Sequence, residues 1–268
     1  MIAFILPLKP KAQSKNWEKD CSLLQRTIGS LLNQRNSNYQ IFVVYTDEPL
    51  IKNTDSKITW VKFPYPFVAF DNIPDASEIL PHFSYDKLML ERRWDKSRKI
   101  FYGCKQAKEK GCTYFMSVDA DDLISNRLVE YVEERLSTDD CPGFYINRGY
   151  LLQYGSNRMI RMDDGMQNFN GSTHLLRSDL VPIPDFEKGK WLDYNLFTSH
   201  GWVLHRLKES RNVHLEAIPF PAVIYVAHGG NISKVSSLGF AERIKRWVKL
   251  IVRGQQLNKC IRKEFAVQ

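Results

Sequence analysis

Tyr114-Phe115-Met116-Ser117-Val118-Asp119-Ala120-Asp121-Asp122 is a short apolar run that ends in three carboxylates. Four of its first five residues are apolar, which is typical of a strand covered on both faces of a parallel sheet. Adjacent carboxylates repel one another and cannot enter the core unpaired, so we expect them at the carboxyl end of this strand. Ligands bind at that end of the strands in open α/β sheets. A carboxylate cluster there suits a hard divalent cation that carries phosphates.

The sequence before this run predicts a parallel βαβ unit. Residues 2–6 and 41–45 are apolar enough to form buried strands, and residues 58–62 form a plausible third. Between the first two strands, apolar residues recur at spacings of three and four from Trp17 to Leu32, and Asn16 can cap the resulting helix. Strand, helix and strand in this order place the chain in the α/β class. We expect a Rossmann-like, mainly parallel central sheet flanked by helices.

The other elements follow from shorter patterns. Residues 63–93 contain four prolines and are expected to form a loop with short helical pieces. A helix is predicted from Trp94 to Gly111, and another after Ser125 or Asn126. Further elements are a strand over 143–147, a hairpin of 149–154 and 158–162, a short helix around 191–205 and a last strand over 223–227.

Length and composition indicate one large domain. A chain of 268 residues with 43% apolar and 25% charged residues is ordinary for a globular protein, and no segment approaches the ~18 apolar residues of a membrane span. The five cysteines show no C-x2-C pairing, which argues against a disulfide framework and a zinc ribbon. The first eight residues lack the basic lead and cleavage site of a secretory signal. We therefore expect reduced thiols and a cytoplasmic location.

Most of the net charge of +8 lies near the C-terminus, where residues 240–268 carry eight bases against two acids. This distribution disfavours nucleic-acid binding, which usually spreads bases over a face. Apolar residues between 240 and 251 recur with helical spacing beside these bases. Such a helix can make a peripheral contact with an anionic membrane or can dock on the domain, and both leave the same pattern. We divide the chain into a domain over 1–235 and a basic amphipathic C-terminal helical segment over 236–268.

The sequence contains several different short motifs, most of them at the ends of predicted strands or in predicted helices. They are Ile5-Leu6-Pro7, Val43 to Asp47, the helix that starts near Asp95, Asp119-Ala120-Asp121-Asp122, Trp191 to Tyr194, and His228 with Ser233. In order and spacing they resemble the motifs of the GT-A nucleotide-sugar glycosyltransferases, particularly the inverting, family-2-like group. Two motifs depart from that pattern: Leu192-Asp193 stands where the family usually has Glu-Asp, and residues 45–49 replace the commoner Asp-Asp-Gly-Ser.

The resemblance implies an activity and a set of nucleotide contacts. A sugar would pass from a nucleotide-diphosphate donor, in the first instance a UDP-sugar, to a hydroxyl of a glycan or lipid-linked acceptor, in the synthesis of a cell-surface or secreted glycan. Pro7 and Asp47 match positions on the nucleotide, with Asp47 at the base. Asp119 is expected at the ribose or at a metal-bound water. Arg98 and Lys99 are expected at phosphate or base.

The resemblance also implies a metal site for Mn²⁺ or Mg²⁺ and a general base. Asp121 is the expected metal ligand. Asp122 is either an alternative ligand or a residue that holds the ligand in place, and His228 matches a metal-ligand histidine that the family carries late in its sequence. A metal on both phosphates stabilises the charge that grows as the glycosidic bond breaks. Asp193 is expected to remove the proton of the acceptor hydroxyl in a single, inverting displacement.

Each of these residues also has an ordinary explanation. Three acids in a turn are common on surfaces, a histidine often ends a strand, and basic residues on a helix are usually solvated. Asp163 and Asp164 are rival candidates for the base, and residues 170–172 could line an acceptor pocket or an ordinary loop. Two other classes of protein remain open, a nucleotidyltransferase and a non-catalytic sugar-nucleotide-binding module.

Overall fold

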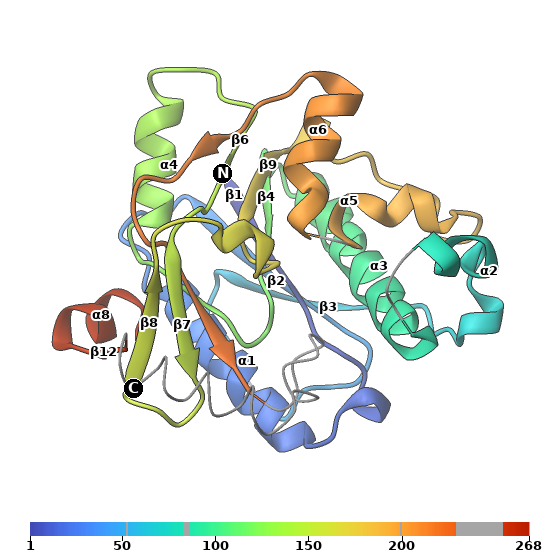
Figure 1. Ribbon diagram of the computed structural model, residues 1–268, viewed down its shortest axis with the longest axis horizontal. Coiled ribbons are helices and arrows are strands. Elements are labelled where there is room, and N and C mark those ends of the chain that lie inside the picture. The colour runs from blue at the N-terminus through green and yellow to red at the C-terminus, as the bar shows by residue number, and fades with distance from the viewer. Residues whose placement is uncertain (52, 83–85, 199, 229–253, 268) are drawn as a thin grey trace.

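The computed structural model describes residues 1–51, 53–82, 86–198, 200–228 and 254–267, which form two sheets with helices around them (Figure 1). The large sheet has the order β10-β6-β9-β4-β1-β2-β3, and the small sheet has the order β12-β8-β7-β11-β5. The strands of the large sheet are β1 Ile2–Pro7, β2 Tyr39–Tyr45, β3 Ile58–Lys62, β4 Tyr114–Ser117, β6 Gly143–Tyr145, β9 His174–Arg177 and β10 Glu216–Ala217. Those of the small sheet are β5 Leu123–Ile124, β7 Gly149–Gln153, β8 Arg158–Met162, β11 Val223–Ala227 and β12 Gln255–Gln256.

The helices of the described residues are of α and 3-10 type. The α-helices are α1 Trp17–Leu32, α2 Ala76–Ile79, α3 Lys87–Glu109, α4 Leu128–Leu136, α5 Asn195–Thr198, α6 Val203–Arg211 and α8 Lys259–Glu264. The 3-10 turns are η1 Lys11–Gln13, η2 Phe70–Asn72, η3 Leu80–His82, η4 Met166–Asn168, η5 Ser178–Leu180, η6 Trp191–Tyr194 and η7 His200–Trp202. None of the helices in these ranges is long and apolar enough to cross a membrane.

Strand β1 lies inside the large sheet between β4 and β2, and the direction of the strand order changes there. It pairs in parallel with β2 on one side and with β4 on the other, and Ile5 is in register with Ser117. The chain leaves β1 through α1 toward β2 and β3, then returns through α3 to β4 on the opposite side of β1. In an α/β sheet, the crevice at such a switch point is where ligands bind. The acid cluster follows β4 directly, so the fold places it at this crevice.

Two apolar cores cover the two faces of the large sheet. Side chains of a strand alternate between faces, and those of β1 do so strictly. Ile2, Phe4 and Leu6 belong to the core with α1, whereas Ala3 and Ile5 belong to the core with α3. The sheet is therefore the middle layer of an α/β/α arrangement, and the expected α/β class with a mostly parallel central sheet is confirmed.

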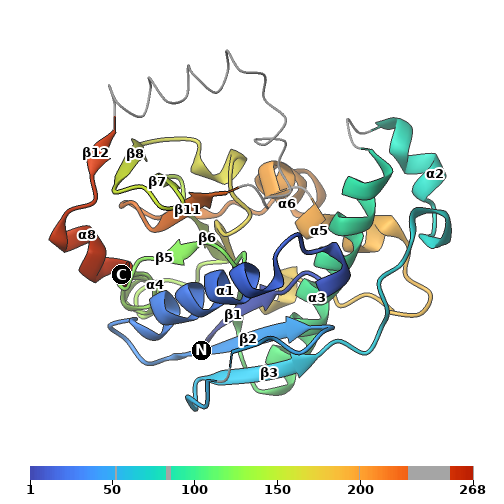
Figure 2. The same ribbon diagram turned by 90° about the horizontal axis from the view of Figure 1, so that it is seen from below.

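The small sheet holds the last described segment of the chain. Strand β12 pairs with β8, and α8 lies beside this sheet (Figure 2). Ile261 and Phe265 of the C-terminal segment pack with Tyr150 and Ile224 of the sheet. Glu264 accepts a hydrogen bond from the Ser125 hydroxyl at 2.6 Å, which joins α8 to the segment before α4. Residues 254–267 thus pack against the rest of the chain, whereas the proposed boundary at 235 and the amphipathic stripe of 240–251 lie outside the described residues.

Most of the predicted elements are present, and several boundaries need correction. The hairpin forms as β7 and β8, and the Asn16 side chain caps α1 by accepting from the Lys19 N–H at 2.9 Å. Helix α3 begins at Lys87 rather than near Trp94, with its N-terminus capped by Asp86. Helix α4 has neither Ser125 nor Asn126 as its N-cap. The predicted helix around 191–205 is broken into η6, α5, η7 and α6, the strand over 143–147 ends at 145, and β11 is not the last strand.

Candidate active site

A cleft of about 320 Å³ opens at the carboxyl ends of β1 and β4. Its walls come from the loop after β1, the first half of α3, the acid cluster after β4, the segment before β9, and η7. Six cations line it, namely Lys9, Lys15, Arg92, Arg93, Lys96 and Lys99. Five acids line it as well, namely Asp20, Asp86, Asp95, Asp119 and Asp121. The cleft therefore offers acidic groups for a cation and basic groups for an anion.

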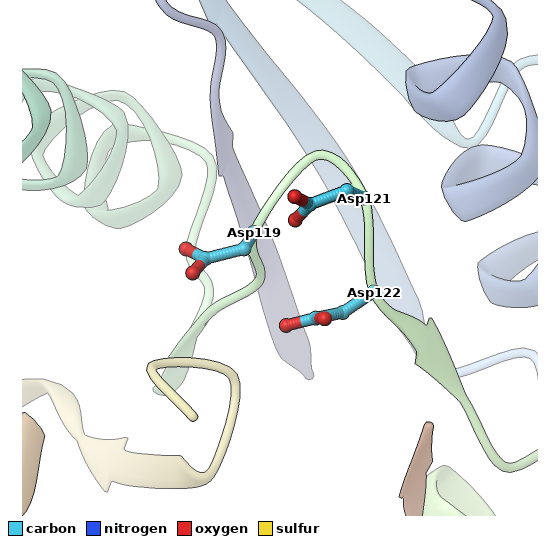
Figure 3. Close-up of side chains that lie close together, drawn as sticks. All are labelled: Asp119, Asp121 and Asp122. Atoms are coloured by element: carbon cyan, nitrogen blue, oxygen red, sulfur yellow. The ribbon is translucent and has the colours of Figure 1, made fainter. Parts of the chain in front are cut away.

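The three carboxylates project from the turn after β4 toward the same side (Figure 3). The Asp122 N–H donates to the Asp119 carbonyl at 3.1 Å, which closes the turn. The Ser172 hydroxyl accepts from the Asp119 N–H at 2.8 Å and donates to Asp122 Oδ2 at 2.6 Å. Asp122 is fully buried, and burial, followed by the charges of Asp121 and Asp119, raises its pKa well above the usual value. Asp122 thus holds the turn from inside. Of the three acids in the cluster, Asp119 and Asp121 line the cleft.

Asp121 and His228 meet across the cleft although they are far apart in sequence. The distance between Asp121 Oδ2 and His228 Nε2 is 2.7 Å, and the side chains are 20% and 3% exposed. Asp121 follows β4 and His228 follows β11, so both stand just beyond the end of a strand. Gly229, Gly230 and Ser233, which follow this histidine in the sequence, lie outside the described residues.

Asp119 is paired with Lys96 of α3. The distance between Lys96 Nζ and Asp119 Oδ1 is 2.5 Å, and both side chains remain about a quarter exposed, at 24% and 26%. Gly171 lies over this pair, and a Cβ at this position would be 3.3 Å from both Asp119 Oδ2 and Lys96 Nζ. A glycine here therefore leaves the pair accessible from the cleft.

The acid cluster has the composition that a divalent cation requires. One ligand atom from each of Asp119, Asp121 and Asp122 can be chosen so that all lie within 4.8 Å of one another. Carboxylate oxygens suit Mg²⁺ and Mn²⁺, and the imidazole of His228 is compatible with Mn²⁺. Asp121 with His228 fits a cation better than Asp122 does, because the oxygens of Asp122 accept hydrogen bonds from Ser172 and from the Val226 N–H.

Lys99 fixes the loop after β1. Its Nζ is fully buried and donates to the Leu8 carbonyl at 2.9 Å and to Asp95 Oδ2 at 2.8 Å. Burial lowers the pKa of Lys99 and raises the pKa of Asp95, and the attraction between the two charges opposes both shifts. Pro7 and Leu8 line the cleft next to this pair. Lys99 therefore holds the backbone of the cleft wall, and its ammonium is already engaged.

Two residues that the resemblance puts at the nucleotide, Arg98 and Asp47, do not line the cleft. Arg98 is not among the residues that line the cleft: it donates to the Phe186 carbonyl at 2.7 Å, and its guanidinium lies 4.7 Å from the centroid of the Tyr65 ring. Asp47 accepts a hydrogen bond from the Lys11 N–H at 2.7 Å and does not line the cleft either. Both side chains hold neighbouring segments in place.

The structure does not bring Asp193 into the cleft. Its carboxylate accepts from the Lys190 N–H at 2.7 Å, within the first turn of η6, and it lines a separate depression beside α6. The rival acids Asp163 and Asp164 do not line the cleft, and Asp163 pairs with Arg161 at 2.7 Å on the surface. None of these three acids lines the cleft that holds Asp119 and Asp121, and the assignment of the general base stays a prediction.

Several residues that line the cleft were not predicted. They are Ser117, His174 and His200, together with Lys96. Ser117 was counted only as part of a strand, and His174 belongs to β9, which is short and follows a polar loop. A histidine and a serine carry no periodic pattern, so only the pairing of β4 with β9 reveals their position. Of the residues proposed for an acceptor pocket, Gly171 lines the cleft, whereas Asn170 and Ser172 are buried behind it.

No family model and no curated protein matches the chain. Among solved structures, Staphylococcus aureus TarS 1–349 in complex with UDP-GlcNAc is 11% identical with a TM-score of 0.48, over 100% of this chain and 73% of that one. For TarS 1–349 in complex with UDP, identity and TM-score are the same, but the match covers 84% of this chain and 60% of the TarS fragment. A Desulfovibrio desulfuricans G20 protein, named as a candidate nucleotide-diphospho-sugar transferase, is 10% identical with a TM-score of 0.35 over 94% and 95% of the chains. At these values no role is transferred from one residue to another, so the function is argued from the geometry.

Proposed function

We propose that this chain transfers a sugar from a nucleotide-diphosphate donor, in the first instance a UDP-sugar, to a hydroxyl of a glycan or lipid-linked acceptor. The observation that carries the proposal is the position of Asp121, which faces His228 at 2.7 Å in a cleft at the switch point of the large sheet. A site of this kind can hold a divalent cation against a ligand that bears phosphates.

Asp121 and His228 are the proposed holders of the metal, which is Mn²⁺ or Mg²⁺. Asp119 is proposed to contact the ribose or a metal-bound water, and Asp122 to keep the turn in shape. When bound, the metal acts as a Lewis acid on the diphosphate leaving group. The buried hydrogen bonds of Asp122 fix the orientation of the turn before any ligand arrives, and such preorganisation lowers the cost of binding.

The basic wall of α3 supports a diphosphate ligand. Arg92, Arg93 and Lys96 of α3 all line the cleft, and Lys96 contacts Asp119 of the acid cluster. Lys96 is a quarter exposed and can reach a phosphate oxygen while it remains near Asp119. Charge-assisted hydrogen bonds of this kind are about twice as strong as neutral ones. Pro7 and the anchored Leu8 carbonyl close the same side of the cleft.

We propose, as the sequence resemblance implies, that the transfer inverts the anomeric centre in a single displacement, which needs one base and no protein nucleophile. The position of Asp193 gives no support for its role as that base, since its carboxylate caps η6 outside the cleft. Arg98 and Asp47 are likewise better explained by their packing and hydrogen-bonding roles.

The test compares Asp121→Asn with Asp164→Asn, an exposed acid outside the cleft. Each protein is incubated with a panel of nucleotide sugars, Mn²⁺ or Mg²⁺ and glycan acceptors, and products are measured by mass spectrometry. Asp121→Asn should reduce turnover of the preferred UDP-sugar at least about 100-fold, since a lost charge-stabilising group typically costs 10² or more. Asp164→Asn should match wild type. Equal turnover in all three proteins contradicts the metal assignment, and release of pyrophosphate from nucleoside triphosphates instead indicates a nucleotidyltransferase.

A further inference from the structure

Ser117, His174 and Asp95 all line the cleft, and we call the part of the cleft that they line the inner pocket. The pairing of β4 with β9 ends at Met116 and Leu175, so Ser117 and His174 are the next residues in register. They lie two positions from Phe115 and Leu176, which are both in the core with α3. Side chains two apart share a face of a strand, so Ser117 and His174 face α3, the helix that carries Asp95.

Each residue of the inner pocket is buried, and within the part of the chain that the structure describes each carries one unpaired polar atom. Asp95 is 5% exposed, Ser117 is 4% exposed and His174 is 2% exposed. Asp95 Oδ1, Ser117 Oγ and His174 Nε2 have no hydrogen-bond partner among the described residues. A buried polar atom without a partner costs about 1–3 kcal/mol, so three in one pocket require an explanation.

The hydrogen bonds behind His174 determine which of its nitrogens carries the proton. The Thr173 hydroxyl donates its single hydrogen to the Asn170 carbonyl at 2.8 Å, so toward His174 Nδ1, at 3.2 Å, it can only accept. Nδ1 therefore carries the proton, and Nε2 presents a lone pair to the cleft. Burial lowers the pKa of His174 to about 3, which keeps the ring neutral.

The inner pocket thus requires a ligand that donates hydrogen bonds. His174 Nε2 and Asp95 Oδ1 can only accept, and Ser117 Oγ can do either. The charge of Asp95 is balanced by Lys99 at 2.8 Å, so the pocket has no excess charge to attract a cation. Phosphate oxygens have no hydrogen to donate and cannot pair with either of these acceptors. Neutral hydroxyl groups meet the requirement.

We propose that the inner pocket binds hydroxyl groups of the transferred sugar and selects the donor sugar by them. This inference rests on the proposed function, because it takes the diphosphate and its metal to lie at Asp121, beside Asp119. The sugar is bonded to that diphosphate, and Ser117 is only two residues before Asp119. A site built to hydrogen-bond a hydroxyl strongly disfavours an analogue that lacks it, because the buried groups then stay unpaired.

The test substitutes Ser117→Ala and uses Ser97→Ala as its matched control. Ser97 is also buried, at 1% exposure, and its hydroxyl also lacks a partner, but it does not line the cleft. Binding of UDP, UDP-glucose, UDP-galactose and UDP-N-acetylglucosamine is measured by calorimetry with Mn²⁺. We expect Ser117→Ala to weaken the best UDP-sugar about tenfold, as for one lost hydrogen bond, and to leave UDP unchanged. Ser97→Ala should leave both unchanged, and neither substitution should lower the melting temperature of the free protein.

A second variant, His174→Leu, removes the Nε2 acceptor and should weaken the same UDP-sugar without weakening UDP. If Ser117→Ala and His174→Leu weaken UDP and the UDP-sugar equally, the pocket binds the nucleoside and the inference is wrong, while the proposed function stands. If neither variant changes any affinity, the pocket is only a structural feature and the inference is also wrong. If wild type binds none of the four compounds, the proposed function itself fails.

Discussion

The carboxylate of Asp193 caps a helical turn, which leads to a direct prediction. In Asp193→Asn the side-chain oxygen can still accept the hydrogen bond from the Lys190 N–H, so the fold should be retained. Because Asp193 does not line the cleft, the turnover number should stay within about twofold of wild type, which is far less than the effect of removing a general base. Steady-state kinetics with the preferred donor check this. A loss of about 100-fold in a folded variant would restore Asp193 as the base.

At the scale of single residues, strand ends were predictable and side-chain partners were not. The apolar run before Asp119 and the strand before His228 indicate where each chain segment ends, and Asp121 and His228 meet as that reasoning requires. The partners of Arg98 and Lys99 depend on how α3 packs, since one side chain faces the Phe186 carbonyl and the other the Leu8 carbonyl. A basic pattern on a helix is the same whether its members are solvated, buried or bound to phosphate.

At the scale of helices and strands, too, the elements with a clear local pattern were predictable and those that depend on tertiary contacts were not. Strands β1, β2 and β4 form from recognisable apolar runs, whereas β5 has only two residues and β9 begins with a histidine and ends with an arginine. These short strands owe their existence to pairing with β11 and β4, which no local pattern records. The early start of α3 at Lys87 was hidden because its first turns follow a segment with four prolines, where a long helix is not expected. Tertiary contacts override local propensity at such places.

The C-terminal helix α8 offers a test of how firmly its segment belongs to the fold. Phe265 is fully buried, and its ring meets Tyr150 edge to face at 5.9 Å. Phe265→Ala should lower the free energy of unfolding by about 3–5 kcal/mol, the usual cost of a buried phenylalanine. Cys260→Ala on the exposed side of the same helix should change it by less than about 0.5 kcal/mol. Urea denaturation measures both, and equal stability of the two variants would mean that α8 contributes little to the folded state.

For the molecule as a whole, the sequence predicted the class of fold but not which distant segments come together as the walls of the cleft. Two cores on opposite faces of one sheet follow from the alternation of strands and helices along the chain. The walls of the cleft come from segments separated by more than 100 residues, such as the loop after β1 and the segment before β9. Their meeting depends on the antiparallel return of β9 beside β4, and this contact also buries His174.

Burial of His174 and His200 predicts that the folded state is sensitive to mild acid. Burial lowers the pKa of His174 from 6.5 to about 3 and that of His200 to about 4. Below pH 6.5 the unfolded chain binds protons that the folded chain does not. Full stability is therefore present above about pH 6.5 and is lost progressively as the pH falls toward the folded-state values.

At pH 5 the loss from His174 alone amounts to about 2 kcal/mol relative to pH 7.5, from the difference between the two pKa values. The variant His174→Gln cannot take up that proton, so its unfolding free energy should fall about 2 kcal/mol less than that of wild type over the same range, whatever its stability at pH 7.5. Urea denaturation at a series of pH values compares the two slopes. Parallel slopes would mean that His174 is protonated in the folded protein. Its Nε2 would then donate a hydrogen bond into the cleft, and the sugar hydroxyl proposed to bind there would have to accept one.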